Sequence, residues 1–294
     1  MNSLLHLFPF ILACVFATGK VYGAGADIPQ PVPPADRAAV TVTVPFDLYD
    51  GYMIVAHGSA GPLKGLNFFV DTGTTLPVFD SKVLQKLHLQ HEAPVSIVVL
   101  GGKAQGQEAV LPSLSFGPVQ WSNLQVVTID LSFFRKVIPV RIDAIVGLNV
   151  VGQRAFVIDY SARVIRFGRT PVLPVSVPLR MDGGLATFDA EIDHAPVHLA
   201  FDTGADSLIL FNTDARSPGS KRKVEPDHIG NFTRKAVRLH SIRLGNAEFG
   251  QKSAAVVDSP KQSPFDFDGV VSPAALGIVQ VSIDLQRGVL GFSR

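Results

Sequence analysis

The tripeptide Asp-Thr-Gly occurs twice in this chain of 294 residues, as Asp71-Thr72-Gly73 and as Asp202-Thr203-Gly204. Each copy follows a mostly apolar run, at residues 66–70 and 197–201. A carboxylate at the end of a buried strand is costly to keep. Two close carboxylates do not both ionise readily, so they share a proton, and one can act as a base while the other acts as an acid. Asp71 and Asp202 are therefore a candidate pair for general acid–base chemistry.

Other short patterns recur between the two halves of the chain. The separation of the copies shortens slightly from one pattern to the next, as short deletions between repeated elements would produce. Phe116-Gly117 recurs as Leu244-Gly245, Asp143-Ala144-Ile145-Val146 as Asp268-Gly269-Val270-Val271, and Phe167-Gly168-Arg169 as Phe292-Ser293-Arg294. We infer an internal duplication with two similar lobes of about 125 to 130 residues.

Short apolar runs rich in Val, Ile, Phe and Thr alternate with Gly, Pro, Asn and Asp along most of the chain, which favours strands. The clearest runs are 40–45, 53–56, 95–100, 124–129, 155–158 and 164–167. Short helices are expected at 81–87, capped by Asp80 or Ser81, and at 148–153 and 272–276. The prediction is an all-β protein with lobes at 40–172 and 173–294, joined by the Pro-rich segment 171–178.

These motifs resemble those of the aspartic proteases of the pepsin and retroviral-protease superfamily, in a bacterial-type, single-chain form. In that superfamily each half has an Asp-Thr/Ser-Gly loop and a later hydrophobic-hydrophobic-Gly segment, for which Ile145-Val146-Gly147 and Val270-Val271-Ser272 are the counterparts. The resemblance covers about residues 40–294 and implies two lobes of β-barrel type. It implies that Asp71 and Asp202 hold a catalytic water, and that Thr72, Gly73, Thr203 and Gly204 lock the two loops together.

The residues that follow each motif differ between the halves. A hydroxyl at Thr74 can donate to the outer oxygen of the Asp71 carboxylate, whereas Ala205 cannot, and we expect a pH optimum less acidic than that of a typical pepsin. The resemblance implies that Asp206 contacts the substrate backbone, with a local salt bridge as the alternative. Its counterpart Thr75 has no charge, so the two halves of the cleft should recognise substrate differently. Ser272 in place of glycine leaves the geometry of the second loop open.

The superfamily closes a β-hairpin flap over its substrate. The candidate flap in the first lobe is the Gly-rich segment 100–106, in which Gly101 and Gly102 would contact substrate, with an ordinary mobile hairpin as the alternative. Its counterpart would be 228–232. Neither segment contains any of the four tyrosines, Tyr22, Tyr49, Tyr52 and Tyr160, so the flaps differ from those of pepsins.

The predicted function is that of an aspartic endopeptidase acting on a peptide or protein substrate as a monomer. One alternative is a catalytically silent peptide-binding or scaffold protein with the same fold, and another is an enzyme that needs a second chain. No cofactor and no metal are expected, because the histidines lack ligand spacing. With 17% charged residues and a net charge of +1, nucleic acid is not an expected partner.

Residues 1–26 resemble an export signal, with an apolar stretch at 4–17 and small residues at 24–26. An uncleaved membrane anchor is one alternative, and a lipoprotein signal at Cys14, the one cysteine of the chain, is another. A Pro-rich leader would follow at 27–39. We therefore predict an exported protein, periplasmic or extracellular, or anchored to a membrane by its N-terminus.

Overall fold

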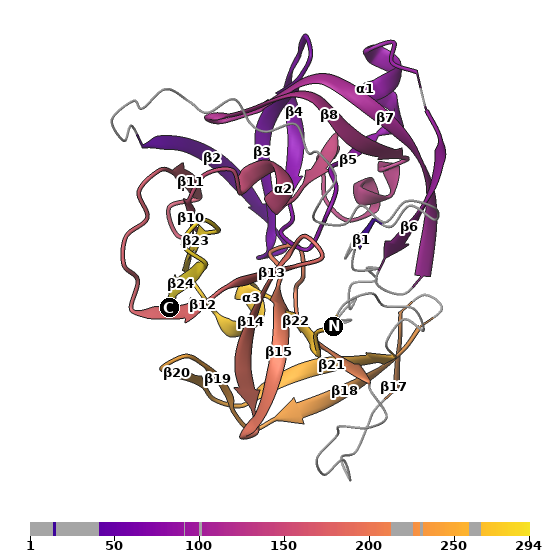
Figure 1. The fold of residues 1–294 in the computed structure, drawn as a ribbon. Coiled ribbons are helices and arrows are strands. Elements are labelled where there is room, and N and C mark those ends of the chain that lie inside the picture. The colour runs from indigo at the N-terminus through magenta and orange to yellow at the C-terminus, as the bar shows by residue number, and fades with distance from the viewer. Residues whose placement is uncertain are drawn as a thin grey trace.

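The computed structural model describes residues 14–15, 41–90, 92–99, 102–212, 226–229, 232–258 and 266–294. These residues form two lobes built almost entirely of strands, with a few short helices, as Figure 1 shows. The prediction of an all-β protein with duplicated lobes is confirmed. The expected export signal and leader lie outside the described residues, apart from a short strand β1 (Cys14–Val15) that pairs with β6. None of the helices described here is long and apolar enough to cross a membrane.

Within the described residues, the first lobe contains the ten strands β2 to β11. They are β2 (Val42–Tyr49), β3 (Met53–Ala60), β4 (Leu63–Val70), β5 (Val78–Asp80), β6 (Pro94–Val99), β7 (Gly102–Phe116), β8 (Val119–Ile129), β9 (Ala144–Val146), β10 (Phe156–Asp159) and β11 (Val164–Phe167). Its helices are α1 (Ser81–Lys86), the 3-10 turn η1 (Ser132–Lys136) and α2 (Leu148–Val151).

The second lobe repeats this plan. Its strands are β12 (Val175–Pro178), β13 (Arg180–Asp182), β14 (Leu185–Ile192), β15 (Ala195–Phe201), β16 (Leu208–Asn212), β17 (Pro226–Ile229), β18 (Phe232–Leu239), β19 (Ile242–Leu244), β20 (Ala247–Phe249), β21 (Lys252–Asp258), β22 (Gly269–Val271), β23 (Gln280–Asp284) and β24 (Val289–Ser293), with helix α3 (Pro273–Leu276).

Strand order shows the duplication directly. The first lobe has the order β6-β7-β8-β5-β9-β4-β3, and the second has β17-β18-β21-β16-β22-β15-β14. In both lobes the strand that precedes Asp-Thr-Gly runs parallel to the strand of the hydrophobic segment, so that Val70 pairs with Val146 and Phe201 with Val271. The parallel pairing fixes where each aspartate emerges from its sheet.

A shared sheet joins the lobes, in the order β2-β11-β10-β23-β24-β12. At its centre β10 and β23 pair antiparallel, with Phe156 opposite Ile283 and Ile158 opposite Val281. Because β10 and β23 are themselves equivalent strands of the two repeats, this contact is self-complementary, like the interface of a two-fold dimer. The lobes therefore face each other across a pseudo-two-fold axis.

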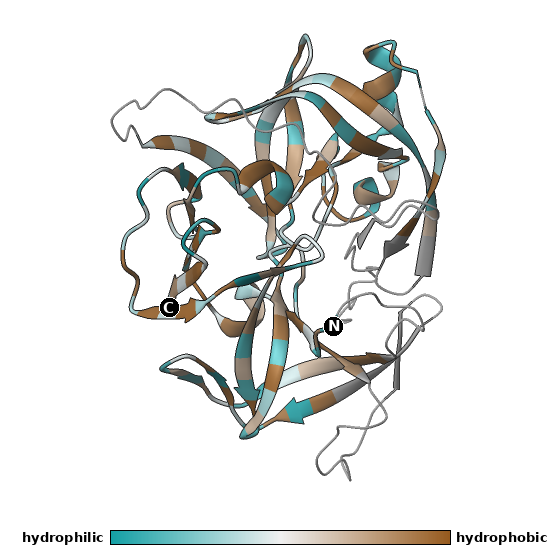
Figure 2. Cartoon of the chain, viewed as in Figure 1, coloured by the Kyte–Doolittle hydropathy of each residue, from teal (hydrophilic) through white to brown (hydrophobic). Residues whose placement is uncertain are grey.

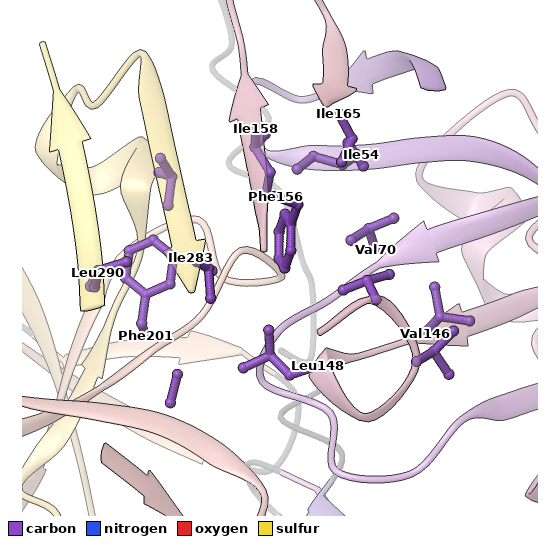
Figure 3. Packing of buried hydrophobic residues seen from close by; sticks show 14 of the residues in the cluster. Ile54, Val70, Val146, Leu148, Phe156, Ile158, Ile165, Phe201, Ile283 and Leu290 are labelled. Atoms are coloured by element: carbon purple, nitrogen blue, oxygen red, sulfur yellow. The ribbon is translucent and has the colours of Figure 1, made fainter. Parts of the chain in front are cut away.

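The largest hydrophobic cluster is continuous across that axis. Figure 3 shows Phe156 and Ile158 from one lobe beside Ile283 and Leu290 from the other. Hydrophobic and hydrophilic segments alternate along many of the strands in Figure 2, as expected where one face of a strand packs on a core. The motif strands are exceptions, because Phe68, Phe69 and Val70 of β4 are all buried. A strand buried on both faces holds the residue that follows it rigidly.

The three predicted helices are present, and a pair of antiparallel strands flanks each of the two predicted flap segments. Asp80 caps α1, since its side chain accepts a hydrogen bond from the N–H of Lys82 (2.9 Å). Strands β6 and β7 form the first hairpin, and β17 and β18 form the second. The Gly-rich segment belongs mainly to β7 rather than to a loop: a Cβ on Gly106 would lie 2.8 Å from a methyl group of Val127, so this glycine serves close packing. Residues 100–101 and 230–231 lie outside the described residues, so the predicted contact of Gly101 with substrate stays a prediction.

Candidate active site

The two aspartates occupy equivalent places, each directly after its motif strand. The backbone N–H of Asp71 donates to the carbonyl of Val146, and that of Asp202 donates to the carbonyl of Val271, both at 3.0 Å. These bonds extend the parallel pairing by one residue. The strand pairs therefore deliver both carboxyl groups to the pseudo-two-fold axis, where Asp71 is fully buried and Asp202 is 3% exposed.

Two threonines tie the motif loops of the lobes together. The Thr72 hydroxyl accepts from the Thr203 N–H (3.0 Å) and donates to the Phe201 carbonyl (3.0 Å). The Thr203 hydroxyl accepts from the Thr72 N–H (3.1 Å) and donates to the Val70 carbonyl (3.1 Å). All four hydrogen bonds are buried, and each crosses from one lobe to the other. They hold the two loops in a fixed mutual position.

The motif glycines bring each backbone close to the opposite carboxyl group. A Cβ on Gly73 would lie 2.5 Å from Cγ of Asp202, and a Cβ on Gly204 would lie 2.4 Å from Cγ of Asp71. The N–H of each glycine also donates to the aspartate of its own loop, at 2.8 Å in the first lobe and 2.7 Å in the second. Any larger residue at either position would displace a carboxyl group from the site.

The electrostatic environment favours protonation of both acids. Burial, followed by the charge of Asp202, raises the pKa of Asp71 well above its usual value. Burial also raises the pKa of Asp202, although a hydrogen bond with Asp71 and the backbone N–H groups of Gly204, Gly73 and Ala205 act in the opposite direction. The pair is therefore arranged to keep a proton under conditions in which exposed carboxyl groups lose theirs.

A family model described as "Aspartyl protease" matches the chain twice, at residues 58–150 and 188–292. The chain belongs to the aspartyl protease family. The two matches contain one Asp-Thr-Gly motif each, which agrees with the duplication.

Among the matching solved structures is the crystal structure of basic 7S globulin from soybean. It aligns with a TM-score of 0.50 and 12% identity over 87% of this chain and 95% of that chain, a level of identity that shows a shared fold alone. No curated protein matches this sequence significantly.

In each lobe the strand of the hydrophobic segment pairs with the strand that precedes the motif loop, but the two copies differ at the next residue. A Cβ on Gly147 would lie 2.1 Å from the carbonyl oxygen of Thr74. The equivalent carbonyl in the second lobe, that of Ala205, instead accepts a hydrogen bond from the hydroxyl of Ser272. That hydroxyl also accepts from the N–H of Ala274 (3.2 Å) and caps α3. Ser272 thus replaces close backbone contact with a hydrogen bond.

This difference predicts unequal responses to exchanging the two residues. Gly147→Ser should lower the free energy of unfolding by about 1–3 kcal/mol or more, because its Cβ has no room beside the Thr74 backbone. Ser272→Gly should cost about 1 kcal/mol, since it removes a helix cap and one buried hydrogen bond. Urea unfolding of both variants measures the difference. Equal losses would contradict this account of the two loops.

The remaining predicted site residues lie around the acid pair. Ala205 is buried, and Asp206 is exposed on the turn that follows the second motif. The Thr74 hydroxyl donates to the carbonyl of Leu76 (3.1 Å), so the expected hydrogen bond to the Asp71 carboxylate is not the one that forms. Gly102 begins β7, where it pairs with Val99.

Tyr52, which was not among the predicted site residues, is close enough for the charges of the acid pair to raise its pKa. Its position in a turn directly before a buried strand was the only available signal. Within the described part of the chain, no group of three or more His, Cys, Asp and Glu residues is arranged to hold a metal ion.

Proposed function

We propose that this member of the aspartyl protease family is an endopeptidase that hydrolyses peptide bonds with a water activated between Asp71 and Asp202. The supporting observation is the pair of buried carboxyl groups from equivalent strands, each held against the glycine of the opposite loop. Such a pair shares one proton and needs no covalent intermediate.

In the proposed reaction the ionised carboxylate takes a proton from water while the water oxygen attacks the peptide carbonyl carbon. The protonated carboxyl group donates its proton to the carbonyl oxygen, which gives a neutral tetrahedral intermediate. Breakdown of the C–N bond returns a proton to the leaving nitrogen and restores the carbonyl. The two carboxyl groups titrate as a coupled pair, so either of them can hold the shared proton at the start of the reaction.

A peptide library tests this function. The purified protein, incubated with mixed peptides between about pH 3 and about pH 7, should cleave internal bonds and release fragments detectable by mass spectrometry. Cleavage that persists unchanged in the presence of a metal chelator would agree with a mechanism based on two carboxyl groups. Absence of cleavage by folded protein would instead support the silent peptide-binding alternative.

The pH dependence follows from the direction of the pKa shifts. Activity requires one proton on the pair, so it should fall at low pH when both acids are protonated and at high pH when the shared proton leaves. Because burial raises the pKa of both acids, we expect kcat/KM to decline only above the usual carboxyl range. A profile of kcat/KM with its maximum near about pH 2 would contradict this expectation. Circular dichroism at each pH separates loss of activity from unfolding.

We further propose that the enzyme acts as a monomer outside the cytoplasm. Both motifs of the acid pair come from one chain, so a second copy is not needed to complete the site. Sedimentation should give the mass of a single chain, and an obligate dimer would contradict the proposal. Fractionation of the cells that produce the protein tests its export.

A further inference from the structure

The registers of the strands allow the two lobes to be matched residue by residue. Val55 in β3 pairs with Phe69 in β4, and Thr187 in β14 pairs with Ala200 in β15. Phe69 and Ala200 each lie two residues before a motif aspartate. Val55 and Thr187 are therefore equivalent positions, and so are the residues that precede them in the two hairpins.

Three residues earlier in each hairpin, Tyr52 is the counterpart of Gly184. Gly184 faces the other lobe: a Cβ built at this position would lie 3.4 Å from the side chain of Thr75. Thr75 follows the first motif at the place where Asp206 follows the second. The pseudo-two-fold relation therefore places Tyr52 against Asp206, as Gly184 lies against Thr75.

The environment of the Tyr52 phenol supports this placement independently. Its ring packs against a hydrophobic cluster of the first lobe that includes Phe69 and Ile145. Besides burial, which is the largest effect, four carboxylates raise the pKa of Tyr52, in the order Asp206, Asp50, Asp71 and Asp202. Two of these are the acid pair itself. The phenol is therefore within electrostatic range of both Asp206 and the acid pair.

At the equivalent position in the other half of the site, Gly184 supplies no side chain of its own. Gly184 has a φ of +91°, a conformation that residues with a Cβ rarely adopt. The backbone conformation at Gly184 thus disfavours any side chain in the hairpin of the second lobe, whereas Tyr52 supplies a large aromatic side chain in the hairpin of the first lobe. The two halves of the site differ in shape as well as in charge.

We propose that Tyr52 is a specificity-determining residue, whose ring limits the size of the substrate side chain accepted beside Asp206. On the opposite side of the acid pair, next to Gly184 and Thr75, a larger side chain is accepted. The inference rests on the proposed peptide-hydrolysing site. It predicts that the residues preferred before and after the cleaved bond differ in size.

The experiment compares Tyr52→Ala with Tyr52→Phe in the full chain, with Tyr49→Ala as the control. Tyr49 belongs to the same hairpin, but its pKa is affected only by burial and by Asp47, not by the acid pair. Cleavage of a library randomised on both sides of the bond gives relative kcat/KM values for small and large side chains. The same variants in an Asp71→Asn background give the binding preferences without cleavage.

We expect Tyr52→Ala to increase the preference for Phe or Trp over Ala at one subsite by at least about tenfold. Tyr52→Phe and Tyr49→Ala should leave that preference within about twofold of the parent. If Tyr52→Ala shifts both the cleavage preference and the binding preference, the proposal is supported. If it shifts the binding preference but the parent cleaves no peptide, the role of Tyr52 is supported and the endopeptidase function is overturned. An unchanged profile, equal shifts on both sides, or an equal effect of Tyr49→Ala would overturn the role of Tyr52, as would failure of the Asp71→Asn protein to bind any peptide.

Discussion

Replacing either member of the acid pair by asparagine should abolish peptide hydrolysis without unfolding the protein. General acid–base catalysis contributes about 10²–10⁴-fold to rate, and neither Asp71→Asn nor Asp202→Asn leaves a pair that can both accept and donate a proton. We expect kcat to fall by at least about a thousandfold in each variant. The double variant should be little worse than either single one, because the two carboxyl groups act as a unit.

The same substitutions should stabilise the fold at neutral pH. The pKa of both acids is raised in the native state, so the native state holds protons more tightly than the unfolded chain. Stability from these groups is greatest below the unfolded pKa of about 4 and is lost as the pH rises through the native values. Asparagine carries no charge and so removes the cost of ionising a buried carboxyl group. Both variants should therefore melt at a higher temperature than the parent at about pH 7 but not at about pH 3.

Asp130→Asn provides the matched control, because Asp130 is exposed and remote from the motif loops in sequence. It should retain full activity. Loss of the activity in this control to the same degree, or substantial activity in either acid-pair variant, would contradict the assignment of Asp71 and Asp202. A lower melting temperature of both asparagine variants at neutral pH would contradict the raised pKa values.

Removing one of the hydroxyls that join the loops should produce the largest loss of stability of any single change discussed. Thr72→Val leaves the N–H of Thr203 without an acceptor and the carbonyl of Phe201 without its donor, both in a buried setting. Each unsatisfied group costs about 1–3 kcal/mol, so we expect the free energy of unfolding to fall by about 2–6 kcal/mol. Thr203→Val should have a similar effect through the N–H of Thr72 and the carbonyl of Val70.

Activity should fall together with stability, because the loops that position the two carboxyl groups would separate. Thr72→Ser retains the hydroxyl and should recover most of both properties. Thr187→Val is the matched control: Thr187 is also buried, but its hydroxyl makes a single long hydrogen bond (3.4 Å) to Arg180 within one lobe. For this control, urea unfolding should show a loss of about 1 kcal/mol or less in the free energy of unfolding. Its kcat should fall correspondingly little. Equal losses for Thr72→Val and Thr187→Val would show that the hydrogen bonds between the loops stabilise the protein no more than a hydroxyl within one lobe does.

The sequence was sufficient to predict the duplication, the all-β class and the acid pair. Each of these depends on local information. Apolar runs and turn residues mark strands, and the copies of the motifs are recognisable wherever they occur in the chain. The strand registers reproduce the correspondence already visible in the repeated patterns, since Phe69 pairs with Ile145 and Ala200 pairs with Val270.

Details that depend on single contacts were predicted less well. The Thr74 hydroxyl was expected to reach the Asp71 carboxylate, but it donates to the nearby carbonyl of Leu76. A hydroxyl rotates toward whichever acceptor the local backbone presents, and residue order does not specify that choice. Ser272 raised doubt about the second loop, yet its hydroxyl bonds the backbone of Ala205 and caps a helix.

The sequence by itself determined which residues could form the site, because the repeated Asp-Thr-Gly motif after an apolar run marks a carboxyl group at the end of a buried strand in each half of the chain. Only the tertiary structure decided what surrounds them. The reciprocal hydrogen bonds of Thr72 and Thr203 cross the pseudo-two-fold axis, and so does the approach of Gly184 to Thr75. Such contacts join residues that are far apart in the chain, and their geometry exists only when the two lobes pack against each other.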